Sequence, residues 1–140
     1  MPLRHVLTVY DGTTESEDLL DMVCRIARSQ RAQLTILYVR LVPLKERLPS
    51  YEPGKDPDAD ALVAQAEKIA DRRGVRAASA VRYARGLGAA VVAEARVRGV
   101  DLVALPFSDA DWLAARQIGA DVEAVLSRAT CGVMLYRPGR

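Results

Sequence analysis

Residues 34–42 read Leu-Thr-Ile-Leu-Tyr-Val-Arg-Leu-Val, and apolar side chains stand at both odd and even positions of this run. A strand with one face in water alternates apolar and polar residues, whereas a strand covered on both faces reads as a nearly continuous apolar run. Sheets that are covered on both faces are usually parallel, with helices packed on each side. The stretch therefore predicts a strand of a parallel sheet that helices cover.

Segments on both sides of this stretch alternate between strand patterns and helix patterns. Further apolar runs predict four more strands, at residues 6–10, 76–83, 101–105 and 133–136. Between these runs, apolar residues recur at the spacing of a helix that buries one face. We therefore predict a single α/β domain over residues 1–140, with a doubly wound, mostly parallel sheet of five strands and helices on both faces.

Residue types that favour helix ends support this division. Thr14 and Glu17 have the spacing of a capping box and predict the start of the first helix. Asp56 and Pro57 predict the start of the second helix, as an N-cap residue followed by proline in the first turn. Gly74 suits the left-handed position that often follows a helix, so the second helix is expected to end there.

Residues 43–57 interrupt the alternation of strands and helices. The segment contains four prolines and one glycine, namely Pro43, Pro49, Pro53, Pro57 and Gly54. Proline lacks the N–H group that helix interiors and central strands require, so neither can run through the segment. We expect a long surface loop that is the most mobile part of the chain.

Charge and composition exclude several classes of function. The 20 basic and 18 acidic residues are interspersed, which argues against a nucleic-acid-binding face. No segment approaches the ~20 apolar residues of a membrane span, and the apolar stretch near the N-terminus is too short for a signal peptide. We therefore expect a cytoplasmic protein with no membrane partner. Cys24 and Cys131 are too few for a disulfide framework and too far apart for a metal knuckle, so we expect buried thiols.

Catalytic groups are scarce where a ligand would bind. Doubly wound folds bind ligands beyond the carboxyl ends of their strands, but the only histidine, His5, begins the first strand. Without a histidine at the site, no Ser-His-Asp or Cys-His set can form. Asp109 and Asp111 could bind a cation in principle, and we interpret them as exposed loop residues. We therefore predict no catalytic residues, no metal site and no enzymatic activity.

Two glycine motifs of nucleotide-binding proteins are missing. Gly86-x-Gly88 precedes a helix, as in a dinucleotide fingerprint, but Val91 stands where that fingerprint needs a small residue. We interpret the two glycines as a tight turn. The phosphate-loop pattern G-x-x-x-x-G-K-S/T does not occur in the chain.

The order and spacing of several short motifs resemble one family. Residues 9–13, Val-Tyr-Asp-Gly-Thr, are similar to the V-D-G-S/T that ends the first strand of universal stress proteins, and residues 131–136 are similar to their closing C-P-V-x-V-V. Gly86 and residues 101–103 match the family's glycine before the third helix and its fourth strand. The resemblance implies the sheet order 3-2-1-4-5 and a homodimer formed through the last strand, residues 133–136.

The ATP-binding motif of that family is altered in this chain. Members that bind ATP carry G-x-x-G, nine residues, and then G-S/T; aligned on Gly119, the other three positions here hold Pro106, Asp109 and Ala120. Phosphate needs a close backbone approach and free N–H donors, and Pro106 has no N–H to donate. Asp111 and Asp121 add negative charge that would repel a triphosphate. By the resemblance, Asp11 and the backbone of Val39 remain, on the side of the ribose and adenine.

Three hypotheses of function follow. The leading one is a non-enzymatic stress-response or regulatory protein of the universal stress protein type. It would not bind ATP in the usual way, would need no cofactor, and would act by association with an unknown protein partner. The alternative is a sensor of ATP, AMP or adenosine that uses a remnant pocket of Asp11, Val39 and Gly119. A third is a weak nucleotide hydrolase in which Asp109 or Asp121 acts with Mg²⁺.

Overall fold

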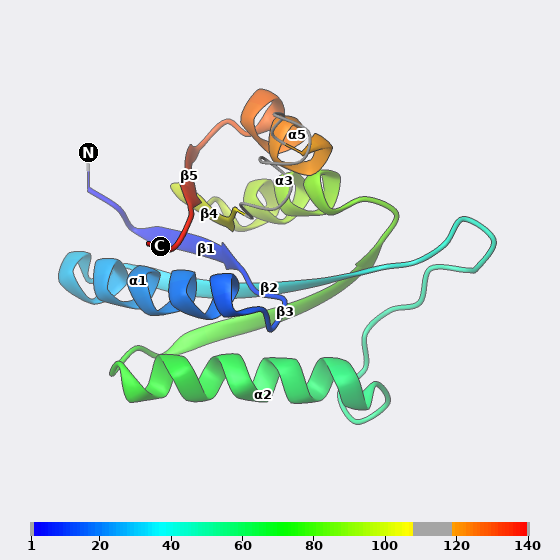
Figure 1. The fold of residues 1–140 in the computed structure, drawn as a ribbon, viewed down its shortest axis with the longest axis horizontal. Helices are drawn as coiled ribbons and strands as arrows, with labels where there is room; N and C mark the ends of the chain where they lie inside the picture. The colour runs from blue at the N-terminus through cyan, green and yellow to red at the C-terminus, as the bar shows by residue number, and fades with distance from the viewer. Residues whose placement is uncertain (1, 108–118, 140) are drawn as a thin grey trace.

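A computed structural model describes residues 2–107 and 119–139 of the chain (Figure 1). In this part, strands and helices alternate along the sequence. The elements are β1 (His5–Val9), α1 (Thr14–Gln30), β2 (Gln33–Leu41), α2 (Pro57–Arg72), β3 (Ala77–Ala84), α3 (Leu87–Arg98), β4 (Leu102–Pro106), α5 (Ala120–Arg128) and β5 (Gly132–Tyr136).

The strands form one five-stranded sheet in the order β3-β2-β1-β4-β5, and every neighbouring pair is parallel. Helices α1 and α2 pack on one face of this sheet, whereas α3 and α5 pack on the other (Figure 1). The predicted fold is therefore confirmed, including the sheet order 3-2-1-4-5 that the family resemblance implied.

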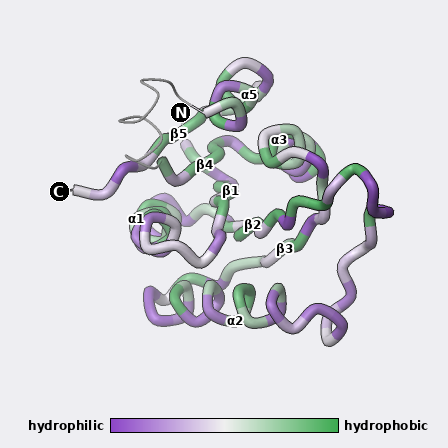
Figure 2. Tube along the Cα trace, turned by 45° about the vertical axis from the view of Figure 1, so that its right-hand side comes forward, coloured by the Kyte–Doolittle hydropathy of each residue, from purple (hydrophilic) through white to green (hydrophobic). Residues whose placement is uncertain are grey.

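Strand β2 has core on both of its faces, which explains its apolar sequence. Leu34 and Ile36 are each 2% exposed and belong to the core under α1 and α2, while Leu37 is 0% exposed and belongs to the core under α3. Alternate side chains of the strand thus point into two different hydrophobic layers. Figure 2 shows hydrophobic residues gathered along the strands between the two helix layers.

Helix α1 begins one residue away from the predicted position. Its N-cap is Thr13, whose Oγ1 accepts a hydrogen bond from the backbone N–H of Ser16 at 3.2 Å. The predicted pair of Thr14 and Glu17 is wrong, because Thr13 carries the same hydroxyl one position earlier. The carboxylate of Glu17 instead accepts a hydrogen bond from the Tyr10 hydroxyl at 3.3 Å.

Helix α2 begins as its sequence predicts. The side chain of Asp56 accepts a hydrogen bond from the N–H of Ala59 at 3.2 Å, and Pro57 is the first helical residue. Past the end of the helix, Gly74 has a φ of +72°, a left-handed backbone that residues with a Cβ rarely adopt. Both ends of α2 therefore follow from residues that are recognisable in the sequence.

Residues 42–56 contain no helix or strand and extend away from the sheet (Figure 1). The Arg85 side chain ties this loop to the end of β3. Its guanidinium donates hydrogen bonds to the backbone carbonyl oxygens of Val42 at 3.2 Å, of Glu46 at 2.6 Å and of Pro43. The loop is therefore irregular but anchored, and its high mobility stays a prediction.

The centre of the sheet is where the chain changes faces. Strands β1 and β4 are neighbours, yet α1, which follows β1, covers one face while α5, which follows β4, covers the other. Because the two connections leave in opposite directions, a crevice is expected between the carboxyl ends of these strands. Within the two described ranges, no helix is long and apolar enough to cross a membrane.

Candidate functional site

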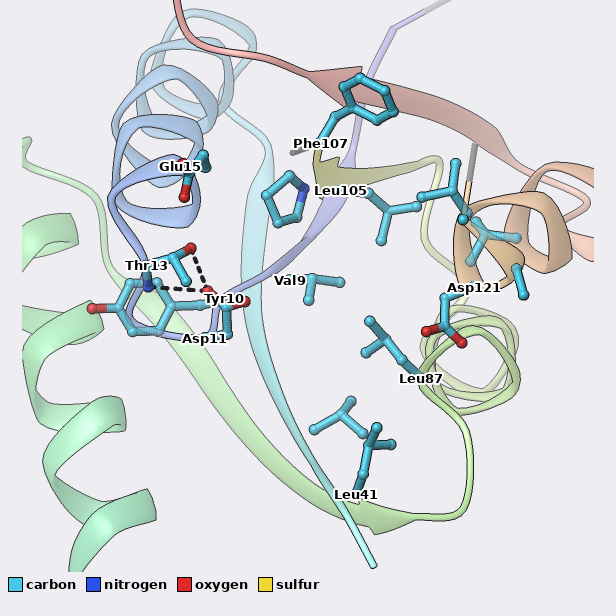
Figure 3. Close-up of a pocket in the computed structure, with 16 residues that line it drawn as sticks. Val9, Tyr10, Asp11, Thr13, Glu15, Leu41, Leu87, Leu105, Phe107 and Asp121 are labelled. Carbon is cyan, nitrogen blue, oxygen red and sulfur yellow. Dashed lines mark hydrogen bonds between the residues drawn. The ribbon is translucent and has the colours of Figure 1, made fainter. Parts of the chain in front are cut away.

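A cavity of about 470 Å³ lies at the carboxyl ends of β1, β2 and β4, where the change of faces predicts it (Figure 3). Strands β1, β2 and β4 supply part of its apolar lining, and helices α3 and α5, which cover one face of the sheet, supply the rest. The apolar residues are Val9, Val39, Leu41, Leu87, Leu105, Val122 and Val125. Pro106 and Phe107, at the end of β4, line it as well.

The floor of the cavity is part of the protein core. Val9 of β1 and Leu105 of β4 are each 3% exposed, and Val125 of α5 is 1% exposed. All three belong to the hydrophobic cluster under α3 and α5, against which Leu87 of α3 also packs. The floor is therefore held in place by the same packing that holds the helices on the sheet.

Asp11 stands at the edge of the cavity, directly after β1. Its Oδ1 accepts hydrogen bonds from the backbone N–H of Thr13 at 3.0 Å and from the Thr13 hydroxyl at 2.6 Å. The turn between them requires Gly12, because its φ is +82° and a Cβ there would lie 2.6 Å from Cδ2 of Leu62 in α2. One oxygen of Asp11 is thus used to shape the turn.

Asp121 lies across the cavity, in the first turn of α5. Its Oδ1 accepts a hydrogen bond from the backbone N–H of Gly88 at 3.1 Å. The N-cap of α3, Gly86, has no side chain to cap the helix, so an acceptor from α5 serves one of the free N–H groups at the start of α3. Asp121 therefore joins two helices at the mouth of the cavity.

Gly88 is a contact point between helices α3 and α5. A Cβ at this position would lie 2.8 Å from Cβ of Ala124 and 2.8 Å from the carbonyl oxygen of Asp121. Real Cβ atoms essentially never approach other atoms that closely. The interpretation of Gly86-x-Gly88 as a tight turn is therefore wrong for Gly88, which lies within α3 and allows α5 to approach.

The sequence matches the profile of the universal stress protein family over residues 2–137. The chain belongs to this family. No curated protein gives a significant match to the sequence.

Several solved structures share the fold of this universal stress protein. A universal stress protein in complex with cAMP has 19% identity and a TM-score of 0.76, over 99% of this chain and 100% of the other. UspA from Lactobacillus plantarum has 19% identity and a TM-score of 0.71, over 98% and 99%. The universal stress protein from Archaeoglobus fulgidus in complex with dAMP has 15% identity and a TM-score of 0.70, over 98% and 100%. At such identities the likeness shows the fold.

Most of the predicted site residues of this universal stress protein line the one cavity. They are Asp11, Val39, Pro106, Gly119 and Ala120. The remaining motif position, Asp109, and the neighbouring Asp111 lie outside the described residues. His5 lies at the opposite end of the sheet, where its Nε2 is 2.7 Å from Oγ1 of Thr35 and burial lowers the pKa of its ring.

The backbone at the end of β4 offers few donors to a ligand. Pro106 has no N–H, and the N–H of Phe107 donates to the carbonyl oxygen of Tyr136 in β5 at 2.8 Å. Neither Pro106 nor Phe107 can therefore donate a backbone hydrogen bond into the cavity. Pro106 was recognised in the sequence, whereas the engagement of Phe107 depends on the pairing of β4 with β5.

The charged residues in the described lining of the cavity all carry the same sign. They are Asp11, Glu15 and Asp121, and the described lining contains no Lys, Arg or His. Asp11 and Asp121 stand on opposite sides of the apolar floor (Figure 3). Glu15, Leu87 and Phe107 were not singled out in the sequence. All three follow the carboxyl ends of strands, in segments where a doubly wound fold binds ligands, and that position is the signal that points to them. Among the described residues, no group of three or more His, Cys, Asp or Glu is arranged to hold a metal ion.

Proposed function

We propose that this universal stress protein is a non-enzymatic stress-response or regulatory protein that does not bind ATP in the usual way. It would act in the cytoplasm, through association with other protein chains, and would need no cofactor. The observation that carries the proposal is the charge of the cavity, in which Asp11, Glu15 and Asp121 are the charged residues of the described lining.

Electrostatic repulsion outweighs the attraction that remains for phosphate. Two like charges about 4 Å apart repel by about 1 kcal/mol in water and by about 4 kcal/mol near a protein surface. The start of α5 at Gly119 attracts an anion, but a helix N-terminus contributes only about 0.3–1 kcal/mol. The resemblance places Asp11 on the ribose side, whereas Asp121 stands at the start of α5, beside the phosphate motif. A carboxylate there would therefore oppose a triphosphate more strongly than one helix end supports it.

The backbone of the motif adds to this effect. A phosphate group bound at a glycine-rich loop accepts hydrogen bonds from successive backbone N–H groups. Here Pro106 lacks the group and that of Phe107 is used by β5. Ala120 also lacks the hydroxyl that a serine or threonine would supply at the last motif position.

Calorimetry with Mg²⁺ and ATP tests the proposal. The wild-type protein should show no binding of ATP at about millimolar nucleotide. A Kd of 1 mM corresponds to a binding free energy of only about 4 kcal/mol, which is no larger than the repulsion between two like charges near a protein surface. Binding of ATP at micromolar concentration would overturn the proposal. The triple variant Pro106→Gly, Asp109→Gly and Ala120→Ser restores the family pattern and should gain measurable affinity.

Association is proposed through the edge strand β5. Among the described residues this strand pairs with β4 alone, and its residues Val133, Met134, Leu135 and Tyr136 are partly exposed. An apolar strand at a sheet edge presents unpaired backbone groups and hydrophobic side chains, which favours pairing with another chain. A second copy of this protein would cover the strand in a homodimer.

The second candidate function is a nucleotide sensor that binds AMP or adenosine. One observation in its favour is that Asp11, Val39 and Gly119 line one cavity. A second is that structures of the same fold were solved in complex with cAMP and with dAMP, ligands that carry a single phosphate. Calorimetry with AMP and adenosine separates the two candidates. Binding of AMP without binding of ATP would favour the sensor.

A further inference from the structure

We propose that the cavity binds a small organic cation, a protonated amine attached to an apolar body about the size of an indole ring. The proposal rests on the proposed function, because a cavity that ATP occupies could not hold the organic cation. Two independent features of the cavity support it, the apolar floor and the placement of the carboxylates.

The floor of the cavity suits an apolar ligand of moderate size. Its volume of about 470 Å³ falls within the range of about 300–1,000 Å³ that is typical of small-molecule sites. In Figure 3 the apolar side chains of Val9, Leu87 and Leu105 lie between Asp11 and Asp121, and Phe107 also lines the cavity. An aromatic or aliphatic body placed on this floor would be removed from water together with these side chains.

The carboxylates of the rim still have oxygens that can accept a ligand proton. In Asp11 and in Asp121, Oδ1 accepts hydrogen bonds from the protein. Within the described part of the chain, Oδ2 of each residue accepts no hydrogen bond, and none of the ion pairs includes Asp11, Glu15 or Asp121. An ammonium group, which carries three donors and a positive charge, complements such oxygens.

The fold explains an acceptor at position 121, and it explains the charge only to the extent of the modest stabilisation that a carboxylate contributes at a helix N-terminus. Asparagine caps helix N-terminal N–H groups about as well as aspartate, so the hydrogen bond to Gly88 needs only an oxygen. A metal ion does not explain the charge, because in the described ranges these carboxylates are not grouped closely enough to hold one. The carboxylates are spread around an apolar floor instead, which suits a cation with a hydrophobic body.

Three indole compounds with the same body and different charges test the proposal. They are tryptamine, which is a cation at neutral pH, tryptophol, which is neutral, and indole-3-propionate, which is an anion. Calorimetry or ligand-observed NMR on the full chain should rank the affinities in the order cation, neutral compound, anion. The affinity for tryptamine should also fall as salt concentration rises, since exposed charges are screened.

Single amide substitutions then each remove one negative charge from the cavity and keep its shape. The variants Asp121→Asn and Glu15→Gln should each weaken tryptamine binding about two- to fivefold, the effect expected of a partly exposed ion pair, and leave tryptophol unchanged. Asp18→Asn is the matched control, because Asp18 is an exposed residue of α1 that does not line the cavity. Thermal unfolding of each variant shows whether it is folded.

The outcomes separate this proposal from the proposed function. A preference for tryptamine that declines in both amide variants supports the organic-cation site. A preference for the anion overturns it, and so does the absence of binding of all three compounds at millimolar concentration. Neither result bears on the exclusion of ATP, which the separate titration with ATP tests. ATP binding at micromolar concentration overturns the proposed function and this inference together.

Discussion

Replacing Gly88 by alanine should destabilise the protein, although the same change stabilises most helices. In a helix interior, alanine is favoured over glycine by up to about 1 kcal/mol. At Gly88 the new methyl group would lie 2.8 Å from Cβ of Ala124 and 2.8 Å from the carbonyl oxygen of Asp121. Helix α5 must therefore move away from α3, and the sign of the effect reverses.

The size of the effect follows from the two contacts that are lost or strained. Inserting a methyl group into a packed contact costs about 1–3 kcal/mol. Moving α5 also weakens the hydrogen bond from Gly88 N–H to the Asp121 carboxylate, which contributes about 1.5–3 kcal/mol when the acceptor is charged. After subtraction of the helix preference of about 1 kcal/mol, we expect a loss of about 2 kcal/mol, or about 4–8 °C in the melting temperature.

Urea denaturation of four proteins measures this effect and its cause. They are the wild type, Gly88→Ala, Ala124→Gly and the double variant. The double variant should recover part of the loss, because the Ala124 methyl is gone while the Asp121 carbonyl remains, and the double-mutant cycle should give a coupling energy of about 0.5–2 kcal/mol. If Gly88→Ala is as stable as the wild type, or more stable, the close approach of α3 and α5 is refuted.

Three further predictions concern the rest of the molecule. Burial alone would raise the pKa of Glu94, but hydrogen bonds from Arg98 and Arg82 hold it below its ordinary value of 4.5. Glu94→Gln should therefore lower the unfolding free energy by about 1–3 kcal/mol at neutral pH. This difference should shrink as the pH falls through the lowered pKa of Glu94, as urea denaturation at a series of pH values would show, and a difference that does not depend on pH would contradict it. Met134→Lys should convert a wild-type dimer to a monomer in light scattering, and a monomeric wild type at micromolar concentration would refute the β5 interface. Amide exchange should be faster in residues 43–57 than in β2, and slow exchange there would show that the anchoring by Arg85 dominates.

The fold could be predicted because its signals are local. The apolar run at residues 34–42 requires core on both sides of a strand, and the structure places Ile36 and Leu37 in two separate cores. Asp56 and Gly74 define the ends of α2 by chemistry that acts within a few residues. The start of α1 was placed one residue too late because adjacent threonines, Thr13 and Thr14, can both cap a helix, and the local sequence does not distinguish them.

The candidate site was only partly predictable, since much of it depends on contacts between distant segments. Asp11, Pro106 and Gly119 could be found from motif spacing, and they do meet in one cavity. The contact between Gly88 and Asp121 joins residues 33 positions apart and depends on how closely two helices pack. Such a distance is set by the whole core, so no local pattern could reveal it.

The hydrogen bond from Gly88 to Asp121 also bears on how this cavity could change in evolution. Only the oxygen Oδ1 of Asp121 is used by α3, so an amide at this position would preserve the fold and remove one negative charge from the cavity. A single base change turns either aspartate codon into an asparagine codon. A single mutation would therefore change the electrostatic preference of the cavity, at an expected cost of about 1 kcal/mol in stability for the lost charge at the helix N-termini. Ligand choice could drift along such a lineage while the architecture stayed constant.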